Sequence, residues 1–479
     1  MRHSLHQRGI TTIMVVGFMG VFMLIMAMLT SYAFEQAKYG RALLAREQAL
    51  SIAEAGLEYY RWFLSHNPGN VQNGTGLPGP YTYTVSDPEG GTLGTASLTV
   101  TGNYQCSTLQ NIDITSKGAA SNNPSYSRTV STRYMQHNVA EYAFLSNSNV
   151  WFSSSNTSVG PYFSNGGIRE DGTNNSIVGS ALANFSCDSS MGCSPTQSKP
   201  GVFGAGSGSA LWQYPVSSID FSGIATNFNT LKTYAQTSGR YFQDNTVSSN
   251  HDSMGYHIVL KSDGTFDAYK VTGTQWVYGY RSNGDCSSGG GWCTDYDIIT
   301  SQTYLGNYTI PSTCGLVYVQ GTLWLEGTLK GKLTIVAADP STTYAPDILI
   351  ANNIAYAATD GTTGLTAIAE HSVRIALNVP DTLNIRGIFV AQSGYYGQDY
   401  HLAGYTNGYD SYIVRSNLNV IGSLVSNQKA GVQWVDGSGN TVSGFRNRTS
   451  SYDQVLAFNP PPFTPAVSSD YHYALWNEQ

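Results

Sequence analysis

Cysteines are the residues of this sequence whose chemistry is most constrained by type and spacing. The chain has six of them: Cys106, Cys187, Cys193, Cys286, Cys293 and Cys314. Cys187 and Cys193 lie close together, as do Cys286 and Cys293, and Gly- and Ser-rich spacers let each short loop close without strain. No histidine stands beside them at metal-ligand spacing. We predict two local disulfides and no zinc site, with free thiols in loops as the alternative; the other two cysteines either pair or stay reduced.

Carboxylates are the second group that could do chemistry, because β-rich enzymes that cleave polysaccharides use a pair of them. The candidates are Asp295, Asp297, Asp360, Glu370 and Asp399. They stand in segments typical of solvated turns. The sequence also lacks the motifs of a nucleophile elbow, a zinc protease, a phosphate loop and a dinucleotide-binding turn. We therefore predict no catalytic residue, no cofactor and no metal, and we interpret the oxygen-rich run from Glu170 to Asn174 as a polar turn rather than a calcium loop.

Tyrosines form a third cluster, in a Gly-rich stretch. It contains Tyr395, Tyr396, Tyr400, Tyr405, Tyr409 and Tyr412. Tyrosine presents a large amphipathic area at low entropic cost, so the cluster is a candidate recognition surface for a surface or carbohydrate ligand. The alternative is that these rings pack on the side of the exterior domain and fill its outer layer.

Composition limits what this 479-residue chain can be. Only 11% of its residues are charged, the formal net charge is −7, and outside the N-terminal region no Lys/Arg cluster exists that could bind nucleic acid. The 51 glycines and 33 tyrosines, together with many Ser, Thr and Asn residues, are typical of short strands joined by frequent turns. The length is enough for two or three domains.

One segment near the N-terminus is long and apolar enough to cross a membrane. Residues 13–34 carry no charge and would span roughly 33 Å as a helix, against about 30 Å for a bilayer core. A secretory signal peptide would have a shorter apolar region followed by an Ala-x-Ala-like site. The basic residues on both flanks leave the orientation open.

The same helix is predicted to continue well beyond the membrane, to about His66. Apolar residues recur at three- and four-residue spacing, so one face is apolar: Ala42, Ala45, Ala49, Ile52, Ala55, Tyr59 and Trp62. Asn67-Pro68-Gly69 then stops the helix.

A short basic leader precedes the apolar run. It ends in Gly9 and abuts Ile10, and this arrangement resembles the N-terminus of a type IV prepilin. The later Glu54-Ala-Gly-Leu-Glu58 stretch resembles PilX-type minor pilins. The resemblance implies that a prepilin peptidase cuts after Gly9 and that the new N-terminal Ile10 is methylated. Major pilins carry Glu as the fifth residue after the cut, whereas this chain has Met14, which points to a minor subunit at a filament tip.

Downstream of the helix the sequence predicts a mainly β fold. Residues 67–137 contain strand-like segments at 81–86, 96–101, 110–115 and 127–135, as expected for a pilin-like sheet. From residue 138 a unit of two apolar residues, a glycine and a third apolar residue recurs at Leu323–Leu329, Leu383–Phe389 and Leu418–Leu424. Repeated short strands of this kind favour a right-handed parallel β-helix, a β-solenoid, with a β-sandwich as the alternative.

The predicted organisation follows from these boundaries. It consists of a leader (1–9), a long helix (10–66, with 13–34 transmembrane), a pilin-like sheet (67–137), the first part of the solenoid (138–200), a small α+β insertion (201–300), the second part of the solenoid (301–459) and a Pro-rich C-terminal tail (460–479). The insertion contains an amphipathic helix that begins with Ser222 near its N-cap and ends at Gly239, and a hairpin around Ser262-Asp263-Gly264.

The sequence therefore predicts a non-enzymatic minor pilin-like component of a type IV pilus or a type II-like secretion system. Its expected partners are prepilin peptidase, other pilins or pseudopilins, and the membrane through its N-terminal helix. It would be a single-pass protein of the inner or cytoplasmic membrane, with its C-terminal domain outside and at the cell surface after assembly. The alternatives are a single-span surface adhesin outside any pilus and a carbohydrate-active β-helix enzyme.

Overall fold

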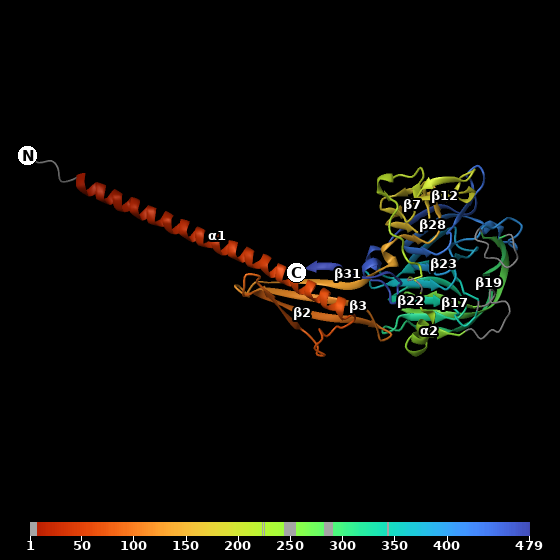
Figure 1. Ribbon diagram of the computed structural model, residues 1–479, viewed down its shortest axis with the longest axis horizontal. Coiled ribbons are helices and arrows are strands. Elements are labelled where there is room, and N and C mark those ends of the chain that lie inside the picture. The colour runs from red at the N-terminus through yellow and green to blue at the C-terminus, as the bar shows by residue number, and fades with distance from the viewer. Residues whose placement is uncertain (1–6, 223, 225, 244–254, 282–290, 343) are drawn as a thin grey trace, which may run out of the picture. The chain divides into compact units, whose positions relative to one another are not determined.

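The chain forms two compact units in this computed structural model, which describes residues 7–222, 224, 226–243, 255–281, 291–342 and 344–479 (Figure 1). The first unit contains Met1–Asn103, Asn111–Tyr134 and Tyr473–Gln479. The second contains Tyr104–Gln110 and Met135–His472. The structure is thus mainly β, with one long N-terminal helix.

Helix α1 covers Gln7–His66, 60 residues, and is the long red helix in Figure 1. It is about 90 Å long at 1.5 Å per residue. It ends where Pro68 and Gly69 follow, because proline cannot continue a helix and Gly69 has a φ of 75°. The predicted helix is therefore confirmed, and within Ile10–His66 it contains a stretch that is long and apolar enough to cross a membrane.

One face of the C-terminal half of α1 is buried in the first unit. The buried residues are Ala45, Ala49, Ile52, Ala53, Leu57, Tyr60 and Leu64, again at three- and four-residue spacing. The predicted apolar face is correct for Ala45, Ala49 and Ile52. It is wrong for Trp62, which is 58% exposed, because the buried stripe runs through Tyr60 and Leu64 instead.

A sheet in the order β1-β2-β3-β4-β31 covers this face of α1; we call it the N-terminal sheet. Its strands are β1 (Tyr81–Ser86), β2 (Thr92–Gln105), β3 (Thr108–Ala120), β4 (Ser127–Asn138) and β31 (Ala466–Glu478). The pairs β1–β2 and β3–β4 are antiparallel. Cys106 and Ser107 form the two-residue turn between β2 and β3, both with positive φ, as a tight hairpin requires.

The last residues of the chain correct a prediction. The segment 460–479 was expected to be a Pro-rich tail, but Ala466–Glu478 is strand β31. It lies beside β4, where Thr129 and Gln479 exchange backbone hydrogen bonds of 3.2 and 2.8 Å. The prolines at 460–462 precede the strand, so their missing N–H groups do not interrupt it.

Among the described residues, most strands of the second unit belong to one large sheet. Its strands are β5 (Phe144–Ser146), β7 (Asn156–Val159), β8 (Tyr162–Ser164), β10 (Thr173–Asn174), β11 (Val178–Ser180), β15 (Trp212–Gln213), β16 (Arg240–Phe242), β17 (Gly255–Leu260), β18 (Thr265–Tyr280), β19 (Trp292–Thr309), β20 (Leu316–Val319), β21 (Thr322–Leu329), β22 (Lys332–Ala337), β23 (Ile348–Tyr356), β24 (Gly364–Ala369), β25 (Val373–Ile375), β26 (Thr382–Ala391), β27 (Tyr396–Gly397), β28 (Val414–Ser426), β29 (Gln433–Val435) and β30 (Thr441–Ser451).

Parallel pairing in register dominates this sheet. One continuous row of paired residues crosses β20, β22, β24, β26, β28, β5, β8 and β11, and its members are Val317, Ile335, Ala367, Phe389, Leu424, Phe144, Tyr162 and Val178. All of them are buried in one apolar core. The row joins β28, late in the chain, to β5, which comes nearly 300 residues earlier.

Two of the three repeated units stack on each other. In β26 and β28, Leu383 pairs with Leu418, Gly387 with Gly422, and Phe389 with Leu424. A Cβ on Gly422 would lie 1.9 Å from the Gly387 carbonyl oxygen, which explains the repeated glycine. The first unit is offset, because Gly327 pairs with Ile354.

Residues 201–300 were expected to form a separate α+β insertion, but two of their strands belong to the large sheet. β16 pairs in parallel with β20, and β17 pairs in parallel with β21, so both are strands of the large sheet. The expected helix is present as α2, Phe228–Thr237. Its predicted start near Ser222 is wrong, because the N-cap is Asn227, whose side-chain oxygen accepts a hydrogen bond from Thr230 N. The hairpin around Ser262-Asp263-Gly264 joins β17 to β18 as predicted.

Short elements complete the second unit. They are β6 (Val150–Phe152), β9 (Ile168–Glu170) and β14 (Val202–Phe203), which form a small parallel sheet; β12 (Asn184–Cys187) and β13 (Gln197–Pro200), which form an antiparallel pair; and the helical turns η1 (Val139–Glu141), η2 (Ser189–Met191), η3 (Ser209–Leu211), η5 (Asp410–Tyr412) and α3 (Gln454–Phe458).

Candidate functional site

The local cysteine pair at 187 and 193 is bonded in the structure. Cys187 and Cys193 are joined with an S–S distance of 2.04 Å, and Cys106 is bonded to Cys314, the two for which the sequence left pairing open. The predicted partner of Cys293, Cys286, lies outside the described residues. Thus two of the three cysteine pairs are placed, and one of them closes a loop of only a few residues.

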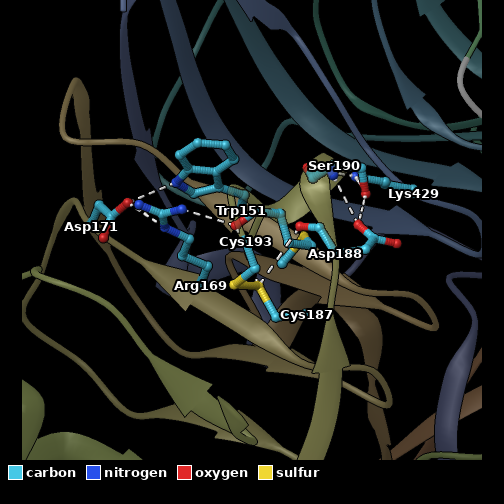
Figure 2. The surroundings of a disulfide bond; sticks show 9 residues. Trp151, Arg169, Asp171, Cys187, Asp188, Ser190, Cys193 and Lys429 are labelled. Atoms are coloured by element: carbon cyan, nitrogen blue, oxygen red, sulfur yellow. Dashed lines mark hydrogen bonds and ion pairs between the residues drawn. A yellow bond between two sulfur atoms is a disulfide. The ribbon is translucent and has the colours of Figure 1, made fainter. Parts of the chain in front are cut away.

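This short disulfide fixes a polar turn. The Asp188 side chain accepts from Ser190 N at 2.9 Å and caps η2. Lys429, far away in sequence, donates to the Ser190 carbonyl oxygen at 3.0 Å and to Ser190 Oγ at 2.8 Å (Figure 2). The loop is therefore held from within by a covalent bond and from outside by a lysine.

Trp151 on β6 is held against the same loop. The Arg169 guanidinium lies over the Trp151 ring at 4.1 Å and donates to the Met191 carbonyl oxygen at 2.9 Å. Asp171 accepts from both Trp151 Nε1 (2.9 Å) and Arg169 Nε (2.7 Å), as Figure 2 shows. Together these contacts fix the indole plane.

A pocket of about 320 Å³ opens beside this assembly. Its walls come from β6, η2, the residue after β18, the residues on either side of β27, strand β29 with the segment before it, and β30. The lining residues that carry its chemistry are Trp151, Arg281, Gln398, Lys429, Trp434 and Arg448. The volume lies at the small end of the range for ligand pockets, roughly 300–1,000 Å³.

Some polar groups of the pocket are fully used by the protein. The Gln433 side-chain oxygen accepts from Ser153 and Ser155, and its amide donates to Thr441 at 2.9 Å. Trp434 Nε1 donates to the Gln398 carbonyl oxygen at 3.3 Å. These residues shape the wall.

Other polar groups of the pocket have no protein partner. The side chain of Gln398 is 1% exposed, yet neither its oxygen nor its nitrogen is hydrogen-bonded within the described chain. Arg448 Nε is likewise unpartnered there, although its Nη2 donates to Ser153. Buried polar groups without partners cost about 1–3 kcal/mol each, so they mark places where a further polar partner fits.

A buried network of charges adjoins the pocket. Arg374 on β25 lies 3.1 Å from Asp295, 3.1 Å from Asp297, 2.8 Å from Asp347 and 3.2 Å from Asp399. Arg281 bonds Asp295 and, at 3.1 Å, Asp399. The network fastens the β18–β19 hairpin to β25 and the segment after β27.

The environment separates the pKa values of these four carboxyl groups. Burial raises the pKa of Asp295 and of Asp297. Burial acts the same way on Asp347 and Asp399, but the neighbouring arginines outweigh it and hold the pKa of both below the usual range. Four carboxyl groups thus face two guanidinium groups, and the pKa values of the four are shifted in opposite directions.

The predicted recognition tyrosines do not form one surface. Tyr395 and Tyr396 are 5% and 2% exposed, so neither ring lies on an exposed surface, although Tyr395, just before β27, lines the pocket. Tyr405 is 54% exposed, and the other three are half-buried. Tyr400 contacts the ring of Trp434, a lining residue of the pocket, with ring centroids 5.7 Å apart.

The predicted acidic candidates divide in two. Asp295, Asp297 and Asp399 are buried in the charge network, not solvated as expected, because the strands and hairpin that carry them fold over one another. Asp360 caps an exposed turn, and Glu370 accepts from Asp339 N. In the described chain one group has metal-ligand spacing, His137, Glu141 and His472, but the two imidazoles are stacked 3.9 Å apart, a poor arrangement for sharing an ion.

Comparisons with known proteins give little. No protein-family model matches the chain, and no curated protein matches it. Among solved structures the chain is similar to the competence-associated pilin ComZ from Thermus thermophilus, with 12% identity over 91% of this chain and 97% of that one, and a TM-score of 0.29. A similarity this low supports neither a shared activity nor a shared ligand.

Proposed function

We propose that this chain is a minor pilin-like component of a type IV pilus or of a type II-like secretion system. The observation that carries the proposal is the division of α1. Its first half is apolar and fully exposed, with Ile13 at 75% and Met28 at 70%, while Ala49 and Tyr60 in its second half are 0% exposed beneath the N-terminal sheet.

The exposed apolar surface of this half-helix must be buried, either in a lipid bilayer or against other protein. About 20 apolar residues suffice to cross a bilayer, and a plain anchor would need no more. Here the same helix continues without a break and serves as the core of a folded unit. A helix that is held in the membrane at one end and carries a sheet at the other suits a subunit that leaves the membrane and packs its apolar half among neighbouring helices.

The N-terminus supplies the second support. Gly9 and Ile10 lie in the first turns of α1, where a basic leader meets the apolar run. Prepilin peptidase is therefore the proposed processing partner, with cleavage after Gly9 and methylation of Ile10. Before assembly the protein is a single-pass protein of the inner or cytoplasmic membrane with its C-terminal unit outside.

The second unit is the proposed display domain, a right-handed parallel β-solenoid. The parallel row from Val317 to Val178 supports a coil of stacked short strands. A unit of this size favours the filament tip, where nothing is stacked above it, and Met14 in place of the usual Glu agrees with that place. Adhesion is the proposed role there.

A carbohydrate-active enzyme is the rival that the buried carboxylates raise. A glycosidase presents an acid and a carboxylate to its substrate across a cleft. In the network around Arg374, Asp399 is the carboxylate that lines the pocket, and it is bonded to Arg281 and Arg374. We therefore propose binding and not catalysis.

Sheared filaments test assembly and position together. Immunogold labelling of this subunit should appear at filament ends, with the major subunit labelled along the shaft as the control. Uniform decoration along the shaft would rule out the tip position. Retention in the membrane fraction, with none in filaments, would favour a plain single-span adhesin.

A further inference from the structure

The pocket beside the 187–193 disulfide combines features that a purely structural cavity does not need. Two indoles line it, Trp151 and Trp434, and each is held by a hydrogen bond from its ring nitrogen. Indole faces attract the C–H face of a saccharide ring, because the ring quadrupole is negative there. The walls therefore offer flat apolar area in fixed orientations.

Gln398 supplies the polar side of the pocket. Its amide has a donor and an acceptor that both lack a partner in the described chain, and its backbone is fixed by a 2.9 Å bond to Gly431. A primary amide that can both donate and accept matches neighbouring hydroxyl groups on one ring. The group is preplaced rather than flexible, so binding would cost it little entropy.

The charges of the pocket favour an anion. Lys429 and Arg448 line it and form no ion pair with a carboxylate among the described residues, whereas the lining carboxylate, Asp399, is paired with Arg281 and Arg374. Burial lowers the pKa of Lys429 and lowers that of Arg448 to about 10, although the charges of Asp188 and Glu170 act in the opposite direction. A ligand carboxylate would give both cations the ion pair that they lack among the described residues.

We propose that this pocket binds an acidic saccharide, with its ring against Trp151 and Trp434, its hydroxyl groups at Gln398 and its carboxylate at Lys429 and Arg448. This gives the proposed adhesive role a ligand class. A neutral sugar would leave the two cations unpaired. A nucleic acid fits poorly, because the chain carries a formal net charge of −7 and has no extended basic surface for a phosphate backbone.

Binding of the full chain in detergent to a panel of oligosaccharides tests the proposal. The panel contains oligomers of galacturonic, glucuronic and sialic acid, the carboxyl-reduced counterpart of each, and single-stranded DNA. At least one acidic oligomer should bind, and its neutral counterpart should bind at least about tenfold more weakly, since a charge-assisted hydrogen bond is worth about 1.5–3 kcal/mol. Equal binding of acidic and neutral forms, binding of DNA alone, or no binding at all would overturn it.

Two variants locate the binding. Lys429→Met should weaken binding of the acidic oligomer about tenfold or more, while Lys330→Met, at an exposed lysine outside the pocket lining, should leave it unchanged. Gln398→Leu should weaken binding without lowering the melting temperature, because it removes an amide that has no protein partner. Unchanged binding in both pocket variants would contradict the assignment. Since no filament is needed, failure here is distinct from failure to assemble into a pilus.

Discussion

Glu170 shows at the scale of one residue how this fold handles charge. It ends β9, is 0% exposed, and uses one carboxylate oxygen to accept from Gly172 N at 2.9 Å. The other oxygen has no partner in the described chain. Burial raises the pKa of Glu170 to about 7, from an ordinary value of 4.5, although the neighbouring Gly172 and Arg448 favour the ionised form.

This shift makes stability depend on pH. The folded state holds the Glu170 proton more tightly than the unfolded chain, so the free energy of unfolding falls as pH rises from about 4.5 to about 7 and levels off above. A shift of this size corresponds to about 3 kcal/mol. Glu170→Gln should therefore match the wild type near pH 4 and be up to about 3 kcal/mol more stable at pH 8.

Denaturant unfolding of the second unit at pH 4, 6 and 8 checks this expectation, with Asp470→Asn, an exposed acid in the same unit, as the control. A Glu170→Gln variant whose stability runs parallel to the wild type across that range would contradict the argument.

Residue-level prediction succeeded where spacing alone decides. The 187–193 disulfide closes a short polar loop, so its two members are close in any fold. The pocket could not be predicted, because Trp151, Gln398 and Trp434 come from segments far apart in the chain. The available signal was an aromatic residue between polar residues, as in Gln433-Trp434-Val435-Asp436. The burial of Tyr395 and Tyr396 could not be predicted either, because a Gly-rich stretch does not reveal which rings face inward.

Close approach of α1 to the N-terminal sheet is the main feature at the scale of elements. A Cβ on Gly118 of β3 would lie 2.1 Å from the Ala49 carbonyl oxygen and 2.4 Å from Ala53 N, the two partners of one helical hydrogen bond. A Cβ on Gly94 of β2 would lie 2.5 Å from the Cδ1 atom of the Ile52 side chain. The helix therefore rests directly on strand backbone.

Gly118→Val should separate helix from sheet. Overpacking costs about 1–3 kcal/mol or more, and here the obstacle is backbone, which cannot rotate away. We expect a lower melting temperature of the first unit and faster proteolysis within residues 67–134. Gly437→Val, at a loop glycine with nothing within 4 Å, is the matched control. Equal stability of the two variants would show that the contact is not tight.

Element prediction depended on whether a pattern is local. Helix α1, strand β1 and the stacked units of β26 and β28 follow from periodicity along the chain. The pairing of β28 with β5, and of β31 with β4, joins segments that are hundreds of residues apart. The sequence of a single strand does not show which distant strand it pairs with. That is why the last strand was taken for a tail.

At the scale of the whole molecule the apolar helix and the pocket lie in different compact units. The first combines an apolar half-helix with a sheet-covered half-helix, and the second carries a pocket suited to a ligand. The disulfide between Cys106 and Cys314 ties the β2–β3 turn to the segment before β20, and so belongs to the second unit. An exported protein would form these bonds outside the reducing cytoplasm.

The mass of the mature N-terminal peptide tests the central claim most directly. Protein recovered from cells that contain a prepilin peptidase should begin at Ile10, lack residues 1–9 and carry one methyl group on its new amino terminus. Gly9→Leu should block both changes, and Gly17→Leu, further along the same helix with nothing within 4 Å, should block neither. A wild-type chain that keeps its first nine residues would contradict the account.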